Sequence, residues 1–266
     1  ALTARGTLQG ESFEGDAYVT DVPLTPFFAY LGQEGSGKIS AHLMASGTLD
    51  APEVRAAFSL ADASWQGVVS REAHGVIGWK DHVLTLNNVE LNPPQGRHHI
   101  DGSVDLSGAE PGLDLTVETT GVRLEPFSEA FHSPYPVTGN LSNTVKVRGP
   151  LSNPTVEGHV HAYDGSFNKF LVDEVDGSYR YDGSVLTLKD FRVKALTAEA
   201  VFAGTVSRDG FLNLGIDAQN VRLQRLPWFR EYVDLAGNVN FSGAVSGTLG
   251  RPHFTGVLSS DSVFVN

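Results

Sequence analysis

The chain has 266 residues, 41% of them hydrophobic, so it is long enough and apolar enough to form a folded core. It carries 31 acidic and 19 basic residues, which gives a formal net charge of −12 at pH 7. An acidic surface repels phosphate backbones and anionic headgroups, and no cluster of Lys or Arg interrupts it. We therefore expect no nucleic-acid partner and no electrostatic docking on a membrane surface.

The absence of cysteine and the spread of turn-forming residues narrow the class of protein. A folded exported protein without disulfides is common in the bacterial periplasm. The 29 glycines and 13 prolines are distributed along the whole chain, which indicates frequent turns and short strands. No apolar run reaches the ~20 residues that span a bilayer, and no signal peptide precedes Ala1. We expect any anchor or export signal of the natural protein to lie outside this sequence.

A motif with constant internal spacing occurs three times. It reads SGTLDAP at 46–52, RGPLSNP at 148–154 and SGTLGRP at 246–252, at offsets of 102 and 98 residues. The segment VLTL at 83–86 also returns 102 residues later, at 185–188. The sequence therefore predicts a repeat of about 100 residues.

This repeat divides the chain into four segments. We expect them to be the C-terminal part of a preceding repeat (1–36), repeat 1 (37–138), repeat 2 (139–236) and the start of repeat 3 (237–266). Together they should form one continuous elongated domain. Because the sequence begins and ends within a repeat, we interpret it as part of a longer chain.

Each repeat is predicted to consist mainly of β-strands with one apolar side. After Gly37, the apolar residues Ile39, Ala41 and Leu43 alternate with polar ones, and a period of two puts them on one face. The repeated motif is predicted as the turn between two such strands, because Gly adopts unusual backbone angles and Pro can open the next strand. Asp-Gly pairs predict further turns at 101–102, 164–165, 176–177 and 182–183.

One segment of each repeat carries aromatic residues at helical spacing. These segments are PFFAYL (26–31), PFSEAF (126–131) and LPWFREYV (226–233), each with Pro where a helix could begin. We predict short amphipathic helices that join one repeat to the next. They either pack on the sheet or narrow the mouth of a groove, and the aromatic residues for the second role are Phe27, Phe127, Phe131, Trp228 and Tyr232.

A unit of about 100 residues with Gly-x9-Gly-x-Leu-x2-Pro spacing, one-sided strands and a short helix resembles the TamB and AsmA-like family of diderm bacterial envelope proteins. The resemblance covers essentially the whole chain. It implies an all-β, elongated repeat sheet called a β-taco, which is bent into a U around an open, solenoid-like apolar groove. It also implies a periplasmic protein with an inner-membrane anchor absent here, and phospholipid transport between the inner and outer membranes. TamB-type members are further tied to the outer-membrane partner TamA and to outer-membrane protein assembly.

The lining of such a groove would come from the alternating apolar positions. We expect it to include Ile39, Leu43, Val54, Phe58, Leu84, Leu86, Leu141, Val145, Val156, Leu186, Leu188, Leu212, Leu214, Val239 and Phe241. Roughly seven or eight strands per repeat, about 4.8 Å apart, would build it. Three functions stay open: a lipid conduit, a scaffold that holds outer-membrane protein strands by strand addition, and a structural spacer whose inward side chains fill the interior.

Motifs that resemble metal or catalytic sites have simpler explanations. His159 and His161 share a face of one strand, but it is the polar outer face, so we expect a solvated pair. His98 and His99 are adjacent and should point to opposite faces. The acidic residues are scattered, and no Ser-His-Asp arrangement has a local signature. We therefore expect no enzymatic activity, no cofactor and no metal.

Overall fold

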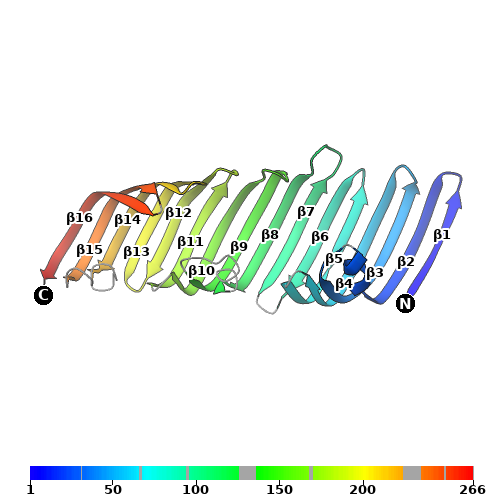
Figure 1. The fold of residues 1–266 in the computed structure, drawn as a ribbon, viewed down its shortest axis with the longest axis horizontal. Coiled ribbons are helices and arrows are strands. Elements are labelled where there is room, and N and C mark those ends of the chain that lie inside the picture. The colour runs from blue at the N-terminus through cyan, green and yellow to red at the C-terminus, as the bar shows by residue number, and fades with distance from the viewer. Residues whose placement is uncertain are drawn as a thin grey trace. The chain divides into compact units, whose positions relative to one another are not determined.

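The computed structural model describes residues 1–30, 32–65, 68–93, 96–125, 136–167, 170–223, 235–248 and 250–265. It is all-β, as the alternating pattern predicts. Sixteen strands, β1 to β16, form one antiparallel sheet in which the strands follow one another in sequence order (Figure 1). The described residues include one short helix, α1 (Thr25–Tyr30), which confirms the helix predicted at 26–31. The helices predicted at 126–131 and 226–233 lie outside the described residues.

The chain divides into two compact units. Unit 1 comprises Ala1–Val122 and Thr144–Pro154, and unit 2 comprises Arg123–Asn143 and Thr155–Asn266. Strand β9 (Val137–Pro150) contributes to both units. The other strands of unit 1 are β1 (Leu2–Gln9), β2 (Ser12–Pro23), β3 (Gly35–Thr48), β4 (Pro52–Trp65), β5 (Val68–Lys80), β6 (Val83–Asn92), β7 (Arg97–Asp105) and β8 (Gly112–Arg123). Those of unit 2 are β10 (Thr155–Phe167), β11 (Phe170–Tyr181), β12 (Val185–Ala195), β13 (Ala198–Ser207), β14 (Phe211–Arg222), β15 (Leu235–Thr248) and β16 (Arg251–Val265).

The strand register sorts the residues of each unit into an apolar face and a polar face. Directly paired residues share a face, and Leu43 pairs with Ala56, which pairs in turn with Ile77. The larger members of the apolar face in unit 1 are Leu2, Leu8, Phe13, Val19, Val22, Ile39, Leu43, Val54, Phe58, Leu60, Ile77, Trp79, Leu84, Leu86, Val89, Leu91, Ile100, Val104, Leu113, Leu115 and Val117. Those in unit 2 are Val156, Val160, Val175, Tyr179, Tyr181, Leu186, Leu188, Phe191, Val193, Phe202, Val206, Leu212, Leu214, Ile216, Val221, Val239, Phe241, Val245, Phe254 and Leu258. The residues between them form the polar face.

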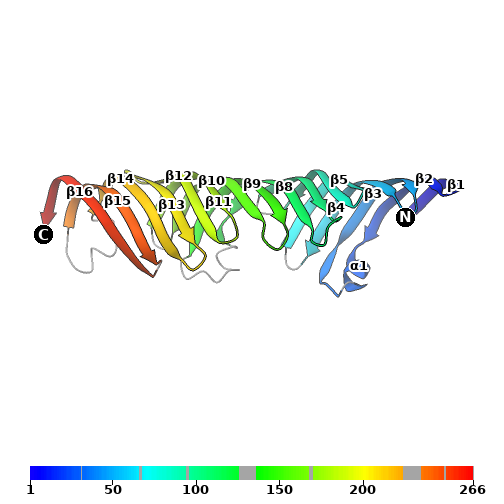
Figure 2. The same ribbon diagram turned by 90° about the horizontal axis from the view of Figure 1, so that it is seen from above.

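The strands are curved, as Figure 2 shows. Irregular residues interrupt them and allow this curvature. The register shifts between Val19 and Val22, between Leu86 and Val89, and at comparable points of other strand pairs. At these shifts lie non-glycine residues in the left-handed conformation: Asp21, Asn88, Asp190 and Asn220, with φ of 50°, 51°, 47° and 55°. An extra residue in one strand of a pair bends that strand and increases its twist.

The backbone amides at these bends have partners on the next strand. The N–H of Asp21 donates to Ser40 Oγ at 3.1 Å, and that of Asn220 donates to Asn240 Oδ1 at 2.9 Å. A bulge leaves an amide outside the ladder, and these side chains give that exposed amide a partner on the next strand.

Three of the four predicted Asp-Gly turns are wrong. The pairs at 101–102, 164–165 and 176–177 lie within β7, β10 and β11, and only Asp182-Gly183 connects two strands. Asp164 has a φ of 52° and Gly102 one of 136°, so residues with turn-forming angles bend these strands without reversing the chain.

The repeated Gly-Leu-Pro motif is confirmed as a turn. Strand β3 ends at Thr48, β4 begins at Pro52, and the Thr48 and Ala51 amides and carbonyls bond each other at 3.2 and 3.3 Å. The expected number of strands per repeat is wrong. Six strands, β3 to β8, lie between Gly35 and Arg123, because strands of 9 to 14 residues use the chain up faster than the short ones that were expected.

Replacing Asn220 by Val should lower the free energy of unfolding by about 1–3 kcal/mol, because a β-branched residue is strained at positive φ. Asn220→Gly should be nearly neutral. Asn213→Val is the matched control, since Asn213 is an exposed, extended residue of the same strand. Urea unfolding followed by circular dichroism measures all three, and equal midpoints for the two Val variants would contradict the role of the bend.

Candidate functional site

The apolar faces contain the residues that the sequence predicts to line a groove. Every predicted lining residue outside β9 is paired by register with other apolar-face residues, as Leu86 is with Ile77 and Leu214 is with Val245. In β9, Leu141 and Val145 lie two residues on either side of Asn143, so alternation puts them on the same face of that strand as Asn143. The predicted residues therefore share the apolar faces of the sheet, and their role as a groove lining stays a prediction.

The apolar faces are only partly covered. Among the described residues, the buried hydrophobic ones are Ala73, Val89, Val122, Leu212, Ala218, Leu223, Val239 and Val245. Most other apolar-face residues are half-buried. Part of the apolar area of each unit therefore stays accessible to solvent or to a ligand.

The positions that the register pairs on the two apolar faces carry no charged side chain in the described strands, although alternation with Ala73 and Val175 puts Arg71 and Asp173 on these faces near the strand ends. Two hydrogen-bonded pairs of uncharged polar side chains also lie on these faces. In unit 1, His98 Nδ1 lies 3.0 Å from Thr119 Oγ1, and burial lowers the pKa of His98. In unit 2, Asn143 Nδ2 donates to the Tyr179 hydroxyl at 2.9 Å. The sequence analysis missed both pairs, although their parity with Ile100 and Leu141 could have revealed them.

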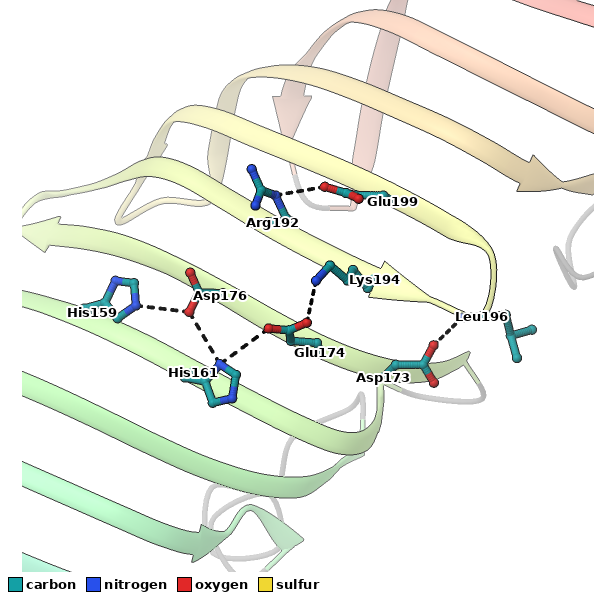
Figure 3. Close-up of polar contacts among 9 residues, drawn as sticks. All are labelled: His159, His161, Asp173, Glu174, Asp176, Arg192, Lys194, Leu196 and Glu199. Atoms are coloured by element: carbon teal, nitrogen blue, oxygen red, sulfur yellow. Dashed lines mark hydrogen bonds and ion pairs between the residues drawn. The ribbon is translucent and has the colours of Figure 1, made fainter.

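The polar face of unit 2 carries a network of ion pairs, which Figure 3 shows. His159 Nε2 lies 3.1 Å and His161 Nδ1 lies 3.4 Å from the same Asp176 oxygen. The Lys194 ammonium lies 2.7 Å from Glu174 and lowers the pKa of that carboxyl. The placement of both histidines on the polar face is as predicted.

This network continues on the neighbouring strands (Figure 3). Arg192 pairs with Glu199 at 2.9 Å, and the Leu196 amide donates to Asp173 Oδ2 at 2.5 Å. The Arg192–Glu199 pair is exposed and the Lys194–Glu174 pair is only partly buried, and pairs this accessible to water contribute about 0–1 kcal/mol. These ion pairs therefore add little to the stability of the fold. Their main effects are to keep this face polar and to favour the observed pairing of neighbouring strands.

The polar face of unit 1 has similar contacts. Asp16 bonds Arg5 at 2.9 Å and lies 3.8 Å from His42, whose ring stacks on Tyr18 with centroids 4.2 Å apart. His99 pairs with Asp101 on this face, opposite to His98, as their adjacency predicts. The two faces of the sheet thus differ sharply in chemistry.

Helix α1 covers the end of β3 through Phe28. A Cβ on Gly35 would lie 2.4 Å from the Phe28 ring, so only Gly fits beneath it. The groove-mouth candidate Phe27 is 57% exposed and is not the residue that packs on β3. The other candidates, Phe127, Phe131, Trp228 and Tyr232, lie outside the described residues.

Features outside the two sheet faces do not identify a function. No family model, curated protein or solved structure matches the chain. In the described ranges, no three His, Asp or Glu side chains are grouped so that they could hold a metal ion. Within those same ranges, no helix has the length and apolarity needed to cross a membrane. The arrangement of residues on the two faces is therefore the basis for inferring function.

In Lys194→Met, we expect the pKa of Glu174 to rise toward its ordinary value, because the hydrogen bond and the charge that lower it are removed. A lowered pKa means that this contact stabilises the fold at neutral pH and that the stabilisation is lost as the pH falls through the folded-state pKa. Carboxyl NMR titration measures the shift. Lys189→Met, on the same strand, is the control, and an equal pKa for Glu174 in both variants would refute the assignment.

Proposed function

We propose that the chain is a TamB or AsmA-like protein that carries phospholipid acyl chains along its apolar face, without enzymatic activity. The observation that carries this proposal is a partly accessible apolar face without charged residues at its paired positions. Uniform one-sided strands are all that a lipid conduit requires. The fifteen lining residues named from the sequence would form its floor.

Transfer energies explain why such a face would serve lipid transport. Each acyl methylene exposed to water costs about 0.8 kcal/mol, so a phospholipid with about 30 methylenes would need on the order of 20 kcal/mol to cross water freely. An apolar surface that the chains contact at every point removes most of that cost. It needs neither a cofactor nor a reaction.

The curved strands support the β-taco form of this proposal. Bends at Asp21, Asn88, Asp190 and Asn220 interrupt the strands in both units. Asn88 and Asp190 are 102 residues apart, which is the spacing of the repeated VLTL segment. Repeated bends would turn the apolar sides of successive strands toward a common concave groove.

The partial exposure of the apolar faces favours an open groove over a filled interior. In a filled solenoid, inward side chains would be mostly buried, whereas the larger apolar-face residues buried in the described strands are Val89, Leu212, Val239 and Val245. Most apolar-face residues between the edges are half-buried. We therefore prefer a lipid conduit to a purely structural spacer.

The cellular setting follows from the same proposal. The protein would work in the periplasm, held by an inner-membrane segment outside this sequence, and would pass phospholipid between the inner and outer membranes. A TamA-like outer-membrane protein would contact other parts of the full-length chain. The acidic net charge of −12 fits a partner contacted through acyl chains rather than through anionic headgroups.

A second candidate function is a scaffold for outer-membrane protein assembly. The partly covered apolar faces favour it as well, because they could hold the apolar side chains of an extended chain. Strand addition at a sheet edge would align such a chain. This function predicts binding of extended peptides and indifference to lipid.

Leu43, Val145 and Leu186, changed together to Asp, should abolish co-purification of phospholipid, because each change puts a charge on the apolar face. The chain is produced in the periplasm of a diderm bacterium and purified without detergent. Native mass spectrometry and lipid extraction then measure bound lipid, and circular dichroism verifies folding.

The matched control changes the neighbouring polar-face residues Met44, Thr144 and Thr187 to Asp, which adds the same charge to the same strands. This control should keep its lipid. Leu43→Asp alone serves if the triple variant does not fold. A wild-type chain free of lipid, or equal lipid in the folded apolar-face and polar-face variants, would contradict the conduit.

A further inference from the structure

The polar pair in unit 1 lies in the most enclosed part of that apolar face. By register, His98 of β7 lies between Leu91 of β6 and Thr119 of β8. Leu91 pairs in turn with Ala73, which is fully buried, and Val89 in the neighbouring row is 7% exposed. The imidazole of His98 and the hydroxyl of Thr119 therefore lie where apolar side chains would be expected.

The strand pairs about one repeat before and after β7–β8 have apolar residues at the positions equivalent to His98 and Thr119. Leu2 pairs with Val19 between β1 and β2, and Ala200 pairs with Ala218 between β13 and β14. These pairs are offset from His98–Thr119 by about one repeat, and they show that the fold does not need polar groups there. Placing polar groups in an apolar site costs free energy unless they are hydrogen-bonded. A use for the polar pair beyond folding is therefore expected.

The pair offers one unused hydrogen-bond donor in either tautomer. If Nδ1 of His98 accepts from the Thr119 hydroxyl, the Nε2–H is left over. If Nδ1–H donates to Thr119, the hydroxyl hydrogen is left over. Among the described residues, Nε2 of His98 has no hydrogen-bond partner. It is also not one of the buried side-chain atoms that lack a partner, so solvent or a ligand can reach it. Burial lowers the pKa of His98, so the ring is neutral at pH 7.

We infer that His98 and Thr119 form a polar binding site for the ester carbonyl oxygens of glycerol-linked acyl chains. The inference rests on the proposed lipid function and names the part of the lipid that the site would recognise. A lone neutral donor within an apolar surface suits an uncharged acceptor that is attached to hydrocarbon. A phosphate or a carboxylate would instead need a cation, and the residues paired directly around His98 and Thr119, namely Leu91, Ile100 and Val117, supply none.

The test compares two lipids that differ only in their linkage. The probes are a phosphatidylethanolamine with two ester-linked chains and its analogue with two ether-linked chains, which lacks the carbonyls. Wild-type protein should retain the ester lipid about threefold to tenfold more strongly, as expected for one hydrogen bond. Native mass spectrometry of detergent-free competition mixtures measures the ratio.

The variant His98→Leu/Thr119→Val should bind the two lipids equally, with ether-lipid binding unchanged. It replaces both partners by apolar side chains, so folding should be preserved. His99→Leu/Thr120→Val is the matched control, because it makes the same changes on the polar face of the same two strands. This control should keep the ester preference.

The outcomes separate this inference from the proposed function. A wild-type chain that binds both lipids equally, or a variant that keeps the ester preference, overturns the polar site and leaves the lipid conduit intact. A wild-type chain that binds neither lipid overturns the conduit and the site with it.

Discussion

Strand register is the constraint on which the rest of the structure depends. Because side chains alternate along a strand, a slip of one residue would move every apolar side chain of that strand to the polar face. In unit 1, the pairs Leu43–Ala56 and Leu86–Gly102 hold the apolar side in line from strand to strand. In unit 2, Leu188–Gly204 and Leu214–Val245 do the same. The separation of the two faces follows from these pairings.

The bends change the direction of the strands without exchanging their faces. At the bends of Asp21, Asn88, Asp190 and Asn220, an extra residue takes the left-handed conformation, and the alternation continues on the far side. Thus Leu86 before the bend of β6 and Val89 after it both pair with apolar-face residues. Exposed ion pairs on the polar face contribute little to stability, so ladder hydrogen bonds and the partly covered apolar face dominate it.

Sequence reasoning could predict the alternation because it depends only on local period. It therefore placed Leu43 and Leu186 correctly and found the turn after Thr48. It could not tell whether Asp-Gly reverses a chain or bends it, because Gly takes a positive φ in both settings, as Gly102 within β7 and Gly183 between two strands show. It also missed the polar pair: alternation with Ile100 puts His98 on the apolar face, but the hydrogen bond to Thr119 follows only from the strand pairing.

The most direct test of the central claim is photo-cross-linking at adjacent positions of one strand. p-Benzoylphenylalanine at Leu86 would lie on the apolar face, and at Thr85 it would lie on the polar face. In cells of a diderm bacterium, the account predicts a phospholipid adduct, identified by mass spectrometry, at position 86 and not at position 85. Equal adducts at both positions, or none at position 86, would contradict it.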